Sequence, residues 1–162
     1  MPDAAEKSGL GTADKAVFSS GTVLAFDFGM RRVGVAIGEY ELRLAHPLIT
    51  IDQAVNKHRF KKIAELIEAW RPVLLVVGLS VHADGTEHEI TQSCRRFAKR
   101  LKERFHLPVI MEDERYTTVM ASLILEEMGI TGRKQRPMLD QLAAQCILQT
   151  FFDSSPHATS GC

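Results

Sequence analysis

The chain has 162 residues, of which 45% are hydrophobic and 25% are charged, as in an ordinary globular domain. Twenty basic and twenty acidic residues give a formal net charge of zero, so a nucleic-acid partner would have to be held by local clusters of charge. The three cysteines, Cys94, Cys146 and Cys162, are far apart and do not indicate a disulfide framework or a zinc site. We therefore expect a cytoplasmic protein.

The two ends of the chain differ in composition from the rest. Residues 1–21 are rich in small and polar residues without periodicity and are predicted to be a disordered leader, and residues 154–162 are predicted to be a disordered tail. Residues 22–153 are predicted to form one domain. No apolar run is long enough to span a bilayer, so we expect no membrane partner.

The predicted elements follow the order β-β-β-α-β-α-β-α-α. Apolar runs predict strands at 23–28, 33–39, 43–51, 73–77 and 108–111. Helical spacing predicts helices at 56–70, 86–105, 118–128 and from Pro137 onward. A tight turn over 29–32 makes the first strand pair antiparallel, and Pro47 marks the third strand as an edge. The pattern predicts an α/β fold with a mixed five-stranded sheet and helices on both faces.

Acidic residues break the apolar pattern at three places. Asp27 ends the first strand, an acidic triplet is expected directly after the fifth strand, and Asp140 lies in the first turn of the last helix. The triplet consists of Glu112, Asp113 and Glu114. Because the carboxyl ends of parallel strands meet at one sheet edge, these carboxylates are expected to gather there.

Three gathered carboxylates are typical ligands of Mg²⁺ or Mn²⁺, and such ions can activate water for phosphodiester hydrolysis. Each acid alone also has an ordinary structural explanation. Asp27 can close a turn, the triplet can form a solvated loop, and Asp140 gains about 0.3–1 kcal/mol from the helix macrodipole. The three together favour a metal site.

Basic residues lie next to these acids in the sequence and are candidates for holding substrate phosphates. They are Arg31, Arg32, Arg115, Arg133, Lys134 and Arg136. The second predicted helix carries a further basic cluster, which is more simply explained as a solvated helix face. Its members are Arg95, Arg96, Lys99, Arg100, Lys102 and Arg104.

Spaced motifs in this chain are similar to those of one known family. The motifs are Asp27-Phe28-Gly29-x-Arg31-Arg32-Val33-Gly34-Val35-Ala36, Ala45-x-Pro47-Leu48, Val76-Val77-Gly78-Leu79, Asp84-Gly85-Thr86, Asp113-Glu114-Arg115-x-Thr117-Thr118 and Asp140-x-x-Ala143-Ala144-x-x-Ile147-Leu148. Over about residues 22–152 the chain resembles the YqgF/RuvX family. The resemblance implies a ribonuclease H-like fold and a hydrolase acting on ester bonds. It implies processing of the 5′ end of pre-16S ribosomal RNA or, alternatively, resolution of Holliday junctions.

The resemblance assigns three catalytic acids by position. They are Asp27, Asp140 and a fifth-strand acid, which is Glu114 or Asp113. Most ribonuclease H-like nucleases carry an acid at the end of the fourth strand, where this chain has Gly78-Leu79-Ser80. The acid then has to reach from the fifth strand, which favours the longer Glu114.

Two other classes of function remain open at this point. Asp-x-Gly before a tight turn also resembles the first phosphate loop of actin-like ATPases, but that fold needs two halves and this chain has the length of one. A non-catalytic RNA-binding assembly factor is the other alternative. Among nucleic acids, pre-ribosomal RNA is favoured over junction DNA. A resolvase would need two symmetric sites, so monomer and homodimer both remain open.

Overall fold

The computed structural model describes residues 20–79, 89–113, 123–130 and 135–154, without the side chains of residues 135 and 136. Residues 1–19 and 155–162, which contain most of the predicted leader and tail, lie outside the described residues. The main elements are β1 (Thr22–Phe28), β2 (Val33–Glu39), β3 (Leu44–Ile51), α3 (Asn56–Trp70), β4 (Leu74–Leu79), α4 (Glu89–Phe105), β5 (Val109–Asp113) and α6 (Gln135–Ser154).

The five strands form one mixed sheet in the order β3-β2-β1-β4-β5. β1 pairs antiparallel with β2 and parallel with β4, and β5 continues the parallel side. The central strand β1 and its neighbour β4 are apolar on both faces because helices cover both faces of the sheet. The predicted sheet, including β3 as an edge, is confirmed.

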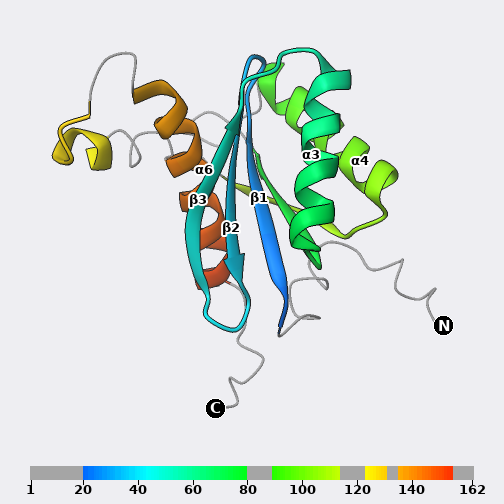
Figure 1. The fold of residues 1–162 in the computed structure, drawn as a ribbon, viewed down its shortest axis with the longest axis horizontal. Helices are drawn as coiled ribbons and strands as arrows, with labels where there is room; N and C mark the ends of the chain where they lie inside the picture. The colour runs from blue at the N-terminus through cyan, green and yellow to red at the C-terminus, as the bar shows by residue number, and fades with distance from the viewer. Residues whose placement is uncertain (1–19, 80–88, 114–122, 131–134, 155–162) are drawn as a thin grey trace.

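The two faces of the sheet are covered by different helices (Figure 1). Alternate residues of each strand divide into two apolar clusters. On β1, Val23 and Ala25 pack in the cluster that includes the buried residues of α6. Leu24 and Phe26 pack in the cluster that includes the buried residues of α3 and α4. We call these the α6 face and the α3/α4 face.

The predicted end of the fifth strand was wrong. The sequence placed Glu112 and Asp113 after the strand, but both belong to β5 and pair with Gly78 and Leu79 of β4. Acidic residues after an apolar run suggest a loop. They can nevertheless belong to a strand, because the hydrogen bonds between strands involve only the backbone. A glycine opposite Glu112 also leaves space beside its side chain. Each acid therefore has a definite face of the sheet.

The ends of two helices also depend on local chemistry. α6 begins at Gln135, two residues before Pro137, because the first turn of a helix tolerates a residue without an N–H. The predicted helix 118–128 is described only from residue 123. It ends as expected at Gly129, whose φ is 80° and whose N–H bonds the carbonyl of Glu126.

Three glutamines of α6 bond to the edge strand β3. Gln149 accepts a hydrogen bond from the Ala45 N–H, and Gln145 donates one to the Ala45 carbonyl. Gln141 donates to the hydroxyl of Thr50 on the same strand. These residues are four apart and so lie on one side of the helix. They fix α6 along β3.

No helix within the described ranges combines the length and apolar character needed to cross a membrane.

Candidate active site

Asp27 lies near the carboxyl end of β1, on the α6 face. Strand alternation places it on the same side as Ala25, whose side chain packs in the cluster with α6. Its partner on β2 is Gly34. Phe26 pairs with Val77 of β4, so the next position level with Asp27 is Gly78. The carboxylate of Asp27 therefore stands between two strand positions without side chains.

Asp140 of α6 packs directly over Gly34 of β2. A Cβ added to Gly34 would lie within 2.9 Å of the Asp140 Cβ and closer still to the backbone carbonyl of Asp140. Only glycine permits this approach. Because Gly34 is also the strand partner of Asp27, the glycine brings the two predicted acids together from positions more than a hundred residues apart.

Arg32 binds Asp140 from the turn between β1 and β2. Its Nε donates a hydrogen bond of 2.7 Å to Oδ2 of Asp140, and each side chain is 20% exposed. The sequence predicted Arg32 as a substrate contact, and in the structure its guanidinium holds a predicted catalytic acid in place. Arg31, beside it, is exposed at the same sheet edge.

The two described acids of β5 lie on opposite faces of the sheet. Glu112 shares the α6 face with Ile110 and is 9% exposed, which makes it the one buried carboxylate among the described residues. Asp113 is exposed and, one residue further, belongs to the α3/α4 face. The structure therefore brings Glu112 to the face of Asp27 and Asp140, whereas Asp113, a predicted metal ligand, is directed to the other side.

Several predicted site residues lie outside the described residues, namely Glu114, Arg115, Arg133 and Lys134. Of Arg136, only the backbone in α6 is described. Within the described ranges, no three potential metal-ligating side chains form a cluster. The described part of the site therefore holds Asp27 and Asp140 together, with Glu112 two strands away on the same face.

The comparisons with known proteins agree with the resemblance seen in the motifs. Residues 21–154 match the model of the family RuvX, described as Holliday junction resolvase. The chain belongs to this family.

Two curated relatives are similar over most of the chain. A protein of Nitrosomonas eutropha is 75% identical over 161 residues, which cover 99% of this chain and all of the relative. A protein of Nitrosomonas europaea is 75% identical over 142 residues, which cover 88% of this chain and 95% of the relative. Both carry the name "Putative pre-16S rRNA nuclease".

A solved structure supports the fold. The fowlpox virus resolvase in complex with Holliday junction DNA aligns with a TM-score of 0.51 at 10% identity, covering 82% of this chain and 97% of the resolvase. The RuvX-family chain thus has the ribonuclease H-like fold that the sequence predicted.

The residues at this edge fit a hard divalent cation. Carboxylate oxygens are the ligands that Mg²⁺ and Mn²⁺ prefer, and Asp27 and Asp140 supply them next to each other on the α6 face, with Glu112 two strands away. Gly34 and Gly78 contribute no side-chain bulk beside Asp27.

One residue of the acidic triplet, Glu112, has a face in the structure that the sequence analysis did not assign. Glu112 was named as part of the acidic triplet but was not selected as a ligand. The alternation of side chains along a strand could have indicated its face, because Glu112 is two positions after Ile110 and therefore points to the same side of the sheet. This argument can be made only when β5 is known to continue through residue 113.

Proposed function

We propose that this chain is a divalent-metal-dependent endonuclease that hydrolyses phosphodiester bonds at the carboxyl edge of β1. The observation that carries the proposal is the approach of Asp27 and Asp140 across Gly34. Glu112 is the third acid that we assign from the described residues, in addition to Glu114, which stays a prediction from the sequence. Asp113 is not part of the proposed site because it belongs to the α3/α4 face of the sheet.

Each side chain has a role in this proposal. Asp27, on a buried strand, and Asp140, on a helix packed against it, would hold Mg²⁺ or Mn²⁺. When bound, such ions activate water and stabilise the leaving oxygen of a phosphodiester. Arg32 orients Asp140 through Oδ2 and leaves Oδ1 outside this bond. Arg31, exposed beside the site, would contact a substrate phosphate, as would the predicted basic residues 115, 133, 134 and 136.

The proposed substrate is the 5′ region of precursor 16S ribosomal RNA, cleaved in the cytoplasm. Support comes from relatives that are 75% identical over nearly the whole chain and are named for this substrate. The second candidate is a four-way DNA junction, and the description of the RuvX family favours it. A junction resolvase needs two symmetric sites, so a stable two-fold dimer would support the second candidate and a monomer the first.

A cleavage assay tests the proposal. The full chain is incubated with precursor small-subunit ribosomal RNA and with a four-way DNA junction, in Mg²⁺, Mn²⁺ or chelator. Asp27→Asn and Asp140→Asn are assayed in parallel, because each removes a charge with little change in shape. We expect discrete, metal-dependent cuts in the RNA that both substitutions abolish.

Other outcomes would separate the alternatives. Cuts in the junction alone would establish the resolvase. RNA binding without cleavage in any metal, unchanged by either substitution, would reject the nuclease and support a non-catalytic assembly factor.

A further inference from the structure

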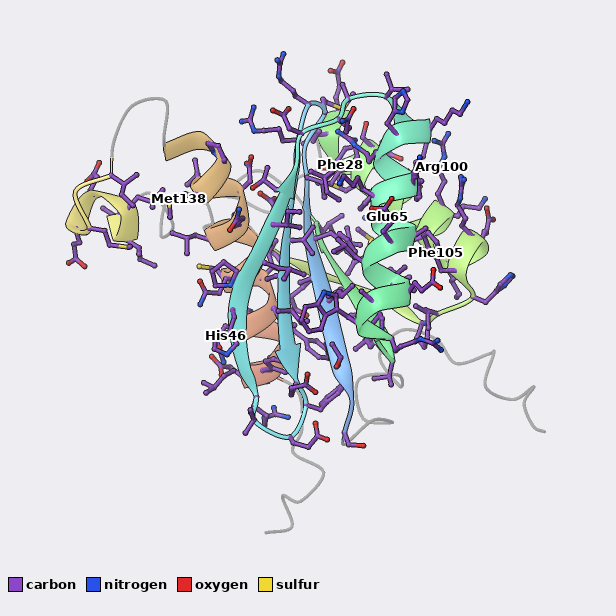
Figure 2. All side chains as sticks on the ribbon, viewed as in Figure 1. Phe28, His46, Glu65, Arg100, Phe105 and Met138 are labelled. Carbon is purple, nitrogen blue, oxygen red and sulfur yellow. The ribbon has the colours of Figure 1, made fainter. Side chains whose placement is uncertain are left out.

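Two adjoining hollows lie on the α3/α4 face of the sheet, away from the acids. A cavity of about 240 Å³ opens between the β1–β2 turn, the start of α3 and α4. A second hollow of about 320 Å³ adjoins it and shares Asn56, Phe60 and Arg100 with it. Phe28 and Arg100 both border the first cavity, at the end of the molecule where α3 begins (Figure 2).

One side of this groove is a row of arginines on α4. Arg96, Arg100 and Arg104 are spaced four residues apart and therefore follow one face of the helix. All three are exposed and line one or both hollows. The sequence favoured a solvated face for the basic cluster. The packing of α3 beside α4 instead turns these three residues into the wall of a groove.

The floor of the cavity contains a buried cation. Arg59 is 2% exposed, and it donates hydrogen bonds of 2.9 Å to the Gln53 carbonyl and 3.1 Å to the Met30 carbonyl. Its guanidinium also lies 5.3 Å from the centre of the Phe28 ring. Among the described residues, none of the arginines lining the groove forms an ion pair with a carboxylate. Burial of the unneutralised charge of Arg59 is costly, and an anion in the cavity would offset that cost.

The turn between β1 and β2 connects this groove with the acidic site. On one face its Arg32 binds Asp140, and on the other its Met30 carbonyl binds Arg59. Within β1, Asp27 and Phe28 are neighbours that point to opposite faces. The two sites therefore meet at one exposed turn, which carries Arg31 and Met30 on its surface.

We infer that the groove is a second phosphate-binding site, which holds the sugar–phosphate backbone of the nucleic-acid strand that leaves the acidic site across the β1–β2 turn. Arginines suit phosphates, and two of the three phenylalanines that line the first cavity, Phe60 and Phe97, offer bases no exposed ring, since they are 2% and 3% exposed. This inference rests on the proposed function for the identity of the strand.

Binding of RNA without metal tests the inference. Affinity is measured in chelator, at several salt concentrations, for a labelled RNA hairpin with a long single-stranded tail and for the same hairpin without the tail. Arg96→Ala/Arg100→Ala removes two charges from the groove. The matched control Lys99→Ala/Lys102→Ala removes two charges from the same helix at positions that line neither hollow.

We expect the arginine variant to bind the tailed hairpin at least about tenfold more weakly, because two charge-assisted contacts are lost. Its slope of log affinity against log salt should fall by about 1.4, since each phosphate contact with a single strand contributes ~0.7. The lysine control and the tailless hairpin should change little. Thermal unfolding of both variants should match the parent, because all four side chains are exposed.

Three results would overturn the inference. Equal losses in the arginine and lysine variants would mean a diffuse basic helix face. No loss in the arginine variant would mean an unused groove. Calorimetry with AMP and with inorganic phosphate is run on the same variants, and loss of their binding with unchanged RNA binding would mean a site for a small anion. Tailed RNA that binds normally to Asp27→Asn without being cut would leave the inference standing, and if the parent does not cut either, only the proposed nuclease would fail.

Discussion

The two faces of the sheet differ most at the edge where β1 ends. On the α6 face, Gly34 lets a helix approach the strands closely, and carboxylates lie at this edge. On the α3/α4 face, phenylalanine rings pack at the same edge and arginines line the groove. Asp27 and Phe28 show the contrast within two residues of β1. Close approach positions groups for chemistry, whereas bulky packing supports a scaffold and a surface for binding.

The largest effect on stability is expected on the α3/α4 face. Phe97 is 3% exposed, and its ring lies 4.9–5.9 Å from those of Phe26, Phe28 and Phe60. Phe97→Ala should lower the free energy of unfolding by about 3–5 kcal/mol, measured by urea denaturation. Phe97→Leu should retain most of the stability. A loss below 1 kcal/mol for the alanine variant would show that this face is not the scaffold.

The largest difference in cleavage rate between two adjacent substitutions is expected on β5, at Glu112 and Asp113. Glu112→Gln should reduce cleavage about 10²-fold or more, because it removes a carboxylate from the proposed site. Asp113→Asn should leave cleavage nearly unchanged, since Asp113 lies on the other face. Cleavage rates under single-turnover conditions measure both variants. The reverse order would mean that the chemistry is not on the α6 face.

The close packing of α6 against β2 can be tested at Gly34. Gly34→Ala should destabilise the protein by about 1–3 kcal/mol through overpacking, and should also lower cleavage because α6 is displaced with Asp140. The control is Gly129→Ala, which meets no neighbour but has a positive φ and should cost about 1–2 kcal/mol. Cleavage per folded molecule separates the two variants. Normal cleavage by Gly34→Ala would contradict the role of this contact.

The smallest effect is expected at the ion pair of the α6 face. Arg32 and Asp140 are each 20% exposed, so their coupling energy should be about 0.5–1 kcal/mol and should decrease with salt. A double-mutant cycle with Arg32→Gln and Asp140→Asn, read by urea denaturation, measures it. A coupling near zero at low salt would mean that Arg32 does not hold Asp140 in solution.

The sequence was sufficient for the architecture because the apolar patterns are regular. The runs of β1 and β4 predict buried strands, and Pro47 predicts the edge. The faces of the acids on β5 were not predictable, because a shift of the strand end by two residues decides whether Glu112 and Asp113 have a face at all. Adjacent residues of a strand point to opposite sides, so the choice of ligand depends on the exact end.

The groove on the α3/α4 face could not be predicted from the sequence for a different reason. Helical periodicity identifies which residues of α4 are buried, as Cys94, Phe97 and Leu101 are. It does not show what stands beside the exposed face. In the sequence Arg59 is one of several basic residues of its helix, and only the packed structure shows that it is 2% exposed and lines one cavity with Arg96 and Arg100.

The glutamines of α6 also limit how copies of this chain can assemble. A sheet that ends in unbonded N–H and carbonyl groups can recruit a strand from another molecule. At this end of the sheet, Gln149 and Gln145 already bond the N–H and carbonyl of Ala45, and Pro47 lacks an N–H to offer. A strand from a second copy that paired with β3 at Ala45 would first have to break these bonds. This part of the edge therefore disfavours both dimerisation through a continuous sheet and strand-by-strand aggregation.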